Sequence, residues 1–274
     1  RPQAAGLPAA AAGGYATAAG FGNTYRLRDG DGARFVHLLD CVSRAAPGVR
    51  IRFTSPHPKD FPPHLLQLIA ERSNICKSLH MPLQSGSDGV LGRMRRGYTR
   101  DAYLALIDDA RSRVKGLALS TDVIAGFCGE TEAEHEETLD VMRRVKFEQA
   151  YMYAYSERSR THAFHRMPDD VPQQDKTRRL QEIIEVFRAG AAERAAEEVG
   201  REHVVLVEGP SRRSTPAAPQ MTGRTDTNKM CVWPAPAAGA ACAGAKPGDL
   251  VRVRVAAANP ATLHAQPLRL LPAP

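Results

Sequence analysis

The sequence lacks the long apolar run that a membrane-spanning helix needs. No stretch of about 18 consecutive apolar residues occurs in its 274 residues. The alanine- and glycine-rich opening, residues 4–20, is too small-sided and too often broken by glycine to be an anchor or the core of a signal peptide. Hydrophobic residues make up 43% and charged residues 24%, which excludes wholesale disorder, collagen and coiled coil. We therefore expect a folded chain with no membrane partner.

Methionine is missing from the start of the chain. The first residue is Arg1, and the first methionine is Met81, deep inside patterned sequence. We therefore expect a portion of a longer protein, with any chemistry ahead of Arg1 lying outside it. The compartment stays open between mitochondrial and cytoplasmic, because a targeting leader would precede Arg1.

Cysteine is scarce and scattered. The five cysteines are separated by 35, 52, 103 and 11 residues, so none forms a close pair: Cys41, Cys76, Cys128, Cys231 and Cys242. An odd, scattered set argues against a disulfide framework and against a self-contained zinc or iron–sulfur site. We interpret each cysteine as a small buried hydrophobe.

Positive charge is unevenly placed. The formal net charge is +7, and residues 201–274 carry +5 of it, from nine Lys or Arg against four Asp or Glu. The first 200 residues therefore carry only about +2. A basic, strand-rich tail beside a nearly neutral body is typical of an appendage that binds the phosphate backbone of nucleic acid. The alternative is solubility charge on a protein of high pI.

Residues 33–200 alternate between predicted helices and strands. Apolar residues at helical spacing predict helices over 33–44, 62–72, 101–114, 131–146 and 173–199, with a short one after residue 89. Residues 131–134 form a capping box. Strands are predicted over 50–54, 76–81, 117–124 and 149–155. This alternation specifies parallel strands with right-handed crossovers, as in the later part of a barrel-like α/β domain.

Polar loops follow the predicted strands at their carboxyl ends, over residues 55–60, 84–88, 126–130 and 156–161. In parallel sheets and barrels such loops meet at one mouth and carry the working residues. Four histidines lack metal-ligand spacing on one helix, so we assign them structural or surface roles: His57, His80, His162 and His165.

Three of these segments contain candidate ligand-binding residues. The Gln and Ser side chains of residues 84–87 can hydrogen-bond a ribose or a carboxylate, although a capped turn explains the same residues. Residues 120–131 run from a strand through glycines to a helix N-terminus, which attracts negative charge, as in many βα units. Arg158 can bind a carboxylate or phosphate in bidentate fashion, or belong to a solvated basic loop.

After residue 200 the pattern changes to short strands separated by turns. Strands are predicted over 203–208, 221–225, 229–233, 250–255 and 263–268, and residues 234–248 form an inserted loop rich in Ala, Gly and Pro. Five short strands with basic faces are typical of a small barrel like those of oligonucleotide-binding folds.

Five motifs occur in order along the chain: RFTSPHP (52–58), LHMPLQSGS (79–87), MRRGYT (94–99), IAGFCGET (124–131) and DDVP (169–172). Together they resemble the radical S-adenosylmethionine (SAM) tRNA methylthiotransferases, the MiaB family. Residues 205–214 and 223–225 resemble that family's terminal TRAM domain, a small RNA-binding barrel. Cys128, where bacterial members usually have proline, and residues 154–166 point to the eukaryotic mitochondrial branch.

The resemblance implies that the full-length protein converts N6-isopentenyladenosine in tRNA to 2-methylthio-N6-isopentenyladenosine by radical chemistry. It also implies SAM and two [4Fe–4S] clusters as cofactors. The cysteines that hold those clusters would lie upstream of Arg1, so we expect no cluster and no metal site in this chain, and its catalytic residues stay unknown. The implied partners are tRNA, SAM and an electron donor for the cluster.

The resemblance also assigns residues to SAM and to RNA. Three resemble the family's ribose-side loop: Gln84, Ser85 and Ser87. Three more resemble its adenine-side strand end: Asp122, Ile124 and Gly126. Arg158 stands where the family has a basic residue near the mouth. In the tail we expect four basic side chains to bind RNA: Arg212, Arg213, Arg224 and Lys229.

The predicted organisation is α/β with an all-β tail. Residues 1–32 are a low-complexity segment, residues 33–200 the C-terminal part of a radical SAM (β/α) barrel, and residues 201–274 a TRAM barrel. Other functions stay open. One is a methylthiotransferase that acts on threonylcarbamoyl-adenosine or on a ribosomal protein. A different class is a non-catalytic protein that binds RNA or a kinase regulator, which the missing cysteines permit.

Overall fold

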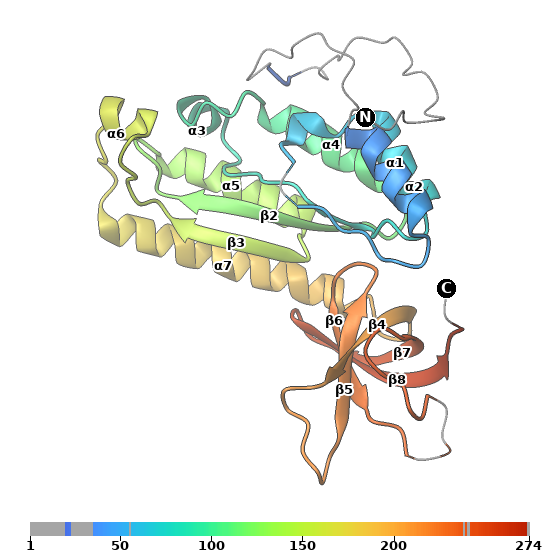
Figure 1. The fold of residues 1–274 in the computed structure, drawn as a ribbon. Coiled ribbons are helices and arrows are strands. Elements are labelled where there is room, and N and C mark those ends of the chain that lie inside the picture. The colour runs from blue at the N-terminus through green and yellow to red at the C-terminus, as the bar shows by residue number, and fades with distance from the viewer. Residues whose placement is uncertain (1–19, 23–34, 55, 238, 240–241, 273–274) are drawn as a thin grey trace.

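The chain folds into an α/β body followed by a small β-barrel (Figure 1). The structure, a computed structural model, describes residues 20–22, 35–54, 56–237, 239 and 242–272. The predicted low-complexity segment 1–32 therefore lies outside the described residues, apart from residues 20–22. In the described part, no helix is both long and apolar enough to cross a membrane.

The α/β body is built on a parallel sheet in the order β1 (Ser78–His80), β2 (Ala118–Ala125) and β3 (Gln149–Ala154). Residues of β2 alternate between fully and partly buried, because one face of the strand packs on the helices and the other is left open. The helices α4 (Arg100–Arg113) and α5 (Glu132–Val145) lie in the two crossovers between these strands. The sheet and its crossovers confirm the predicted α/β class.

The helices are the ones that apolar spacing predicts, with one addition. The remaining helices are α1 (Phe35–Ala45), α2 (Pro63–Glu71), α3 (Asp88–Arg93) and α7 (Gln173–Ala196), with a short 3-10 turn, η1 (Pro58–Asp60). The addition is the five-residue α6 (His162–Arg166), which Thr161 caps by accepting a hydrogen bond from Phe164 N. The buried faces of the helices and the sheet form one core: Leu65, Leu66, Ile69, Tyr103, Ile107, Val123, Met142 and Ile183.

The predicted strand over residues 50–54 is wrong. Only Ile51 pairs there, in a single parallel bridge to Ile75 ahead of β1. Ile51 N donates to Asn74 O at 2.8 Å, and Cys76 N donates to Ile51 O at 3.0 Å. In the described sheet, β1 is an edge strand that pairs with β2. Residues 52–54 do not extend this sheet as a further strand but run beside its open face.

The predicted capping box is present at the start of α5. Thr131 Oγ1 accepts from Glu134 N at 3.3 Å, and Glu134 Oε2 accepts from Thr131 N at 2.8 Å. Each side chain satisfies a backbone N–H that has no partner within the helix. The helix therefore begins where the sequence places it, directly after the loop that follows β2.

The second body is a closed five-stranded barrel in the order β4-β5-β6-β8-β7. The strands are β4 (Glu202–Pro210), β5 (Gln220–Thr225), β6 (Met230–Pro234), β7 (Leu250–Ala258) and β8 (Thr262–Leu270). All five coincide with predicted strands. Alternate side chains fill the interior around one large aromatic: Val205, Val207, Trp233, Val251, Val253 and Leu263.

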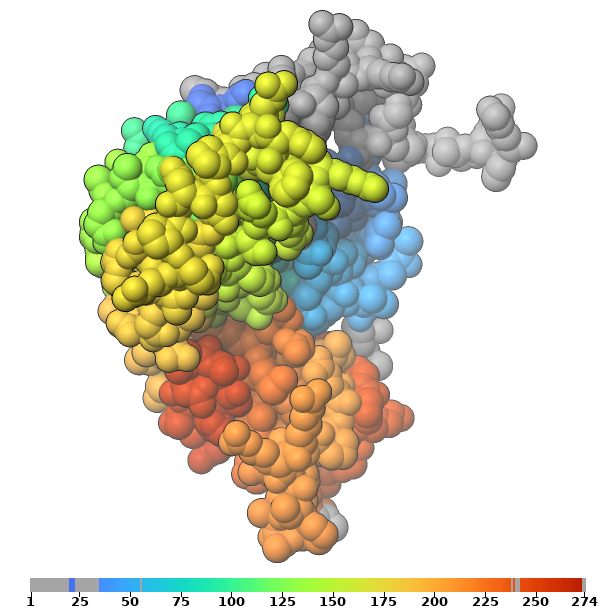
Figure 2. Space-filling model, turned by 90° about the vertical axis from the view of Figure 1, so that its left-hand side faces the viewer, coloured from blue at the N-terminus to red at the C-terminus, as the bar shows by residue number. Residues whose placement is uncertain are grey.

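The barrel lies at the amino-terminal edge of the parallel sheet. The arrowheads of β2 and β3 point away from the barrel in Figure 1, and Lys77, just ahead of β1, donates its backbone N–H to Asp226 of the turn between β5 and β6. Figure 2 views the molecule from the end to which those arrows point, with the barrel below the α/β body. The barrel and the strand-end loops therefore sit at opposite ends of the sheet.

Candidate functional site on the open face of the sheet

A cleft of about 360 Å³ lies over the face of the sheet that the helices do not cover. All three parallel strands line it, together with residues 52–54 and one residue of the β5–β6 turn. The strand residues are Ser78, His80, Ser120, Asp122, Gln149, Tyr151 and Tyr153, and the turn residue is Asn228. The cleft is therefore shared by the two bodies of the chain.

The two-residue period of the strands explains this lining. Side chains at alternate positions of a strand point to opposite faces, so Ser120 and Asp122 face the cleft while Thr121 and Val123 are fully buried. Strands of parallel sheets are usually apolar on both faces. Polar residues on a single face, repeated on three neighbouring strands, indicate a face that meets a ligand or solvent.

His80 and Asp122 form the polar centre of the cleft. His80 Nε2 lies 3.2 Å from Asp122 Oδ2, and His80 Nδ1 lies 3.0 Å from Ser120 Oγ. A carboxylate can only accept, so Nε2 donates to Asp122. The Tyr151 ring stands edge-on to His80 with 5.9 Å between the centroids, and Tyr151 and Tyr153 are 45% and 55% exposed. The cleft thus offers a carboxylate, an imidazole and two aromatic rings.

Sequence reasoning missed His80, Tyr151 and Tyr153. The absence of metal-ligand spacing gives His80 only a structural or surface role, and the pattern around the tyrosines predicts no more than a strand. The signal that finds them is the parity of polar positions, because residues 78, 80, 120, 122, 149, 151 and 153 all fall on one face once the strands are in register.

The loop after β1 holds Gln84, Ser85 and Ser87, and its side chains are buried. Ser85 Oγ lies 3.1 Å from Thr138 Oγ1 and accepts from Ser87 N at 3.2 Å. Gln84 has a positive φ of 66° and continues the sheet by a bridge to Val123. In the structure these polar groups shape the loop, and their contact with SAM stays a prediction.

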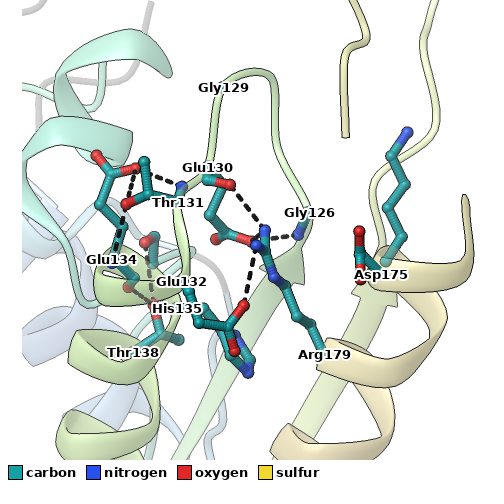
Figure 3. A network of polar contacts seen from close by, with 12 residues as sticks. Gly126, Gly129, Glu130, Thr131, Glu132, Glu134, His135, Thr138, Asp175 and Arg179 are labelled. Carbon is teal, nitrogen blue, oxygen red and sulfur yellow. Dashed lines mark hydrogen bonds and ion pairs between the residues drawn. The ribbon is translucent and has the colours of Figure 1, made fainter. Parts of the chain in front are cut away.

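The loop after β2 is fixed by a buried ion pair. Glu130 Oε2 accepts from Gly126 N at 2.6 Å and from Arg179 Nη1 at 3.1 Å (Figure 3). Burial raises the pKa of Glu130, and the Gly126 hydrogen bond and the Arg179 charge oppose that shift. The Glu130 carboxylate and the Arg179 guanidinium of α7 therefore fix the position of the loop at the carboxyl end of β2. Ile124 lies just before this loop and shares the face of Asp122.

Gly126 occupies a position that only glycine fits. Its φ is +73°, and a Cβ there would overlap Lys176 Cγ. Lys176 cannot move aside easily, because its buried Nζ donates to both carboxylate oxygens of Asp169, at 2.5 and 2.6 Å, and lies 5.3 Å from the centroid of the Tyr155 ring. The close approach of α7 to this loop explains why glycine stands at position 126.

The predicted basic residues fall into two groups. Arg158, in the loop after β3, and Arg212 and Arg213, between β4 and β5, are exposed, and within the described residues their guanidinium groups make no ion pair. Arg224 and Lys229 instead have protein partners: Arg224 Nε lies 3.2 Å from Glu208 Oε1, and Lys229 Nζ lies 3.7 Å from a carboxylate oxygen of Glu198. Arg212 and Arg213 precede β5, whereas Arg224 is its second-to-last residue and Lys229 follows its end.

Among the described residues, no group of three or more His, Cys, Asp or Glu side chains could hold a metal ion. Four of the five cysteines are buried and one is exposed. Burial raises the pKa of Cys76 to about 11 and that of Cys231 to about 12, which disfavours the thiolate that binds iron. The described part of the chain does not fit an iron–sulfur cluster.

Two families match this chain. Residues 17–142 match the Radical SAM superfamily, and residues 196–268 match the TRAM domain. The chain therefore has the domain order of proteins in which a radical SAM domain is followed by a TRAM domain.

Within that class the chain is similar to tRNA methylthiotransferases. It is 49% identical over 249 residues to "Mitochondrial tRNA methylthiotransferase CDK5RAP1" of Mus musculus, covering 89% of this chain and 42% of the mouse protein. It is 47% identical over 233 residues to "tRNA-2-methylthio-N(6)-dimethylallyladenosine synthase" of Chlorobium phaeobacteroides (strain BS1), covering 85% and 50%. The resemblance to the MiaB family is thereby confirmed. The chain spans 42% to 50% of the length of these two relatives.

Proposed function

We propose that the protein containing this chain adds a methylthio group to N6-isopentenyladenosine in tRNA. The observation that carries the proposal is the similarity over 89% of the chain to a protein named for tRNA methylthiotransfer. The bacterial relative is named for the dimethylallyl, that is isopentenyl, adenosine product. This name favours N6-isopentenyladenosine over threonylcarbamoyl-adenosine as the substrate.

The strand-end loops and the cleft are the proposed place for SAM. Asp122 and Ile124 share the open face of β2, and Gly126 follows where the strand ends. A carboxylate such as Asp122 accepts hydrogen bonds from a ribose or an ammonium group. Gln84, Ser85, Ser87 and Arg158 are proposed to complete the site from the loops after β1 and β3. When bound, SAM supplies the methyl group and the precursor of the radical.

No step is assigned to an iron–sulfur cluster in this chain, because its described cysteines are separate and mostly buried. Within the chain, the residues on the cleft are proposed to bind and orient the reactants. The two tyrosine faces suit stacking of an unstacked base, since bases in RNA loops are bound by aromatic side chains in this way. The reaction also needs an electron donor as a partner.

The barrel is the proposed tRNA-binding element. Residues 201–274 carry a net charge of +5, and Arg212 and Arg213 stand exposed at the end of β5 that is remote from the sheet. Exposed cations of this kind bind phosphate and release counterions. We also propose residues 33–200 and 201–274 as the two domains, and a mitochondrial location, which the name of the mouse relative supports.

Nucleoside analysis of tRNA tests the activity. In cells without the gene, mass spectrometry is expected to show loss of 2-methylthio-N6-isopentenyladenosine and accumulation of N6-isopentenyladenosine. Restoring the gene returns the product, and a copy with Asp122→Asn restores less of it. Unchanged product in the deletion strain would refute the enzymatic function and favour a protein that only binds RNA.

A further inference from the structure

Two arginines of the α/β body bind the backbone of the barrel directly. Arg50 donates from Nη1 to Arg224 O and from Nη2 to Val204 O, both at 2.6 Å. Arg52 donates from Nη2 to Thr225 O at 2.7 Å. The partners are more than 150 residues apart in the sequence. We propose that Arg50 and Arg52 are positioning residues that fix the barrel on the α/β body, so that RNA held by the barrel meets the cleft at a set distance.

The acceptor carbonyls lie where the ladder between β4 and β5 ends. Thr225 is the last residue of β5, and its pairing with Val205 is the last pair between β4 and β5. The carbonyls of Val204 and Thr225 are therefore at the end of this ladder, beside the segment that leads into the cleft. A guanidinium presents several N–H groups in a rigid fork, so Arg50 can bridge carbonyls of two strands.

The contact is partly desolvated. Arg50 and Arg52 are both half-buried, and desolvation lowers the pKa of Arg50. A charged donor makes stronger hydrogen bonds than a neutral one, and these three bonds exist only while the barrel is docked. They favour the docked arrangement over a barrel that swings on its connection to α7.

The same contact brings the barrel into the cleft. Asp226 accepts from Lys77 N at 3.2 Å, and two residues later Asn228 lines the cleft beside Arg52. Arg224 Nη1 donates to Asn228 O at 3.3 Å. Arg52 is therefore at once a wall of the cleft and a donor to the barrel, and the position of the turn depends on it.

A third contact explains why the arginines are needed. Glu198, just after α7, lies 2.6 Å from His203 Nε2 and within 3.7 Å of Lys229 Nζ, so the base of the barrel is already attached to α7. This attachment comes from the end of α7 alone. Arg50 and Arg52 belong to a different part of the α/β body, and they bind barrel residues next to those that Glu198 holds, since Val204 follows His203 and Thr225 N donates to Lys229 O at 3.0 Å. Contacts from two separate parts of the α/β body define the orientation of the barrel.

Spin-label distances test the orientation without reference to activity. Cys41 is the one exposed cysteine among those described and carries the first label, and Ala217→Cys, in the exposed loop between β4 and β5, carries the second. The whole chain with Arg50 and Arg52 intact is expected to give one narrow distance distribution. The double variant Arg50→Lys/Arg52→Lys keeps the positive charges but removes the forked guanidinium groups. Its distance distribution is expected to be about twofold broader or more, because domains without a large interface move relative to one another.

Arg111→Lys is the matched control. Arg111 Nη2 donates to Val145 O at 2.7 Å, which is the same chemistry within the α/β body. Its variant is expected to keep the narrow distribution. An equally narrow distribution in the double variant would overturn the proposal, and so would equal broadening in the control, because the effect would then be general loosening.

The functional half of the inference rests on the proposed tRNA modification. In the full-length loaded enzyme, the double variant is expected to bind tRNA within about twofold of the unaltered protein, because Arg212 and Arg213 are unchanged and distant. Its modification rate is expected to fall by about 10- to 100-fold, since small misplacements of a substrate are costly. An unchanged rate despite a broadened distance would refute the positioning role. Absence of tRNA binding by the unaltered protein would refute the proposed function instead.

Discussion

Asp122 Oδ2 lies 3.2 Å from His80 Nε2, across the pair of strands β1 and β2. The imidazole holds the carboxylate in one orientation while one side of it stays open to the cleft. Both residues face a surface that a buried parallel sheet would normally fill with apolar side chains. Their pairing is a specific reason to place ligand binding on this face.

Replacing Asp122 by Asn tests that placement. Asp122→Asn keeps the size of the side chain but removes the charge, and we expect SAM to bind about 10-fold more weakly, since hydrogen bonds to charged groups contribute about 1.5–3 kcal/mol. Equilibrium dialysis with labelled SAM measures the effect. Asp108→Asn, at an exposed acid of α4, is the control and is expected to leave binding unchanged. Equal binding by both variants would remove Asp122 from the site.

A substitution at Gly126 tests how the loop after β2 packs against α7. Gly126→Ala places a Cβ on Lys176 and imposes a positive φ on alanine, so we expect a loss of about 2–4 kcal/mol in the free energy of unfolding. Gly92→Ala is the matched control, because a Cβ at Gly92 in α3 meets nothing within 4 Å. That change is expected to stabilise by up to about 1 kcal/mol. Urea denaturation distinguishes the two, and similar effects of both would contradict the described contact.

The exposed arginines of the β4–β5 loop test the RNA-binding face. We expect Arg212→Ala/Arg213→Ala to weaken tRNA binding and to reduce the slope of log affinity against log salt by about one for each phosphate that the variant no longer binds. Titrations at several salt concentrations measure the slope. Arg188→Ala, at an exposed arginine of α7, is expected to leave the slope unchanged. A double variant with the slope of the unaltered chain would place the RNA elsewhere.

The lowered pKa of Glu198 predicts how acidification affects the stability of the junction between α7 and the barrel. Burial opposes ionisation of Glu198, but the His203 hydrogen bond and the charges of Lys229 and Arg201 outweigh it and hold the pKa below its usual 4.5. A lowered carboxyl pKa adds stability that is complete above the unfolded value and is lost as the pH falls through the folded value.

Glu198→Gln is therefore expected to be less stable near pH 7, by about 1–3 kcal/mol, and to lose less stability on acidification. Melting temperatures between about pH 3 and about pH 7 measure the difference. Glu185→Gln, an exposed residue of α7, is expected to follow the unaltered chain. Parallel curves for Glu198→Gln and the unaltered chain would contradict a contribution from this carboxylate.

Local signals were sufficient for most elements of the fold. The Thr131–Glu134 capping box starts α5 where the sequence predicts, and the five strands of the barrel follow the turn residues between them. These features depend on residues within a few positions of one another, so a single sequence contains them. The strand predicted over residues 50–54 is absent, and only Ile51 pairs there, with Ile75. Strand pairing depends on partners that are distant in the sequence, so local patterns did not reveal this.

The candidate site also has features that local sequence signals predict and features that depend on distant residues. The motifs determined the family, the strand-end loops and the exposed cations Arg212 and Arg213, because these are properties of short segments. Only the tertiary structure decided that His80 faces Asp122, that Arg50 binds a barrel more than 150 residues away, and that the barrel lies opposite the strand-end loops. Register and docking are set by the summed packing of whole elements, and no local pattern of residues contains that sum.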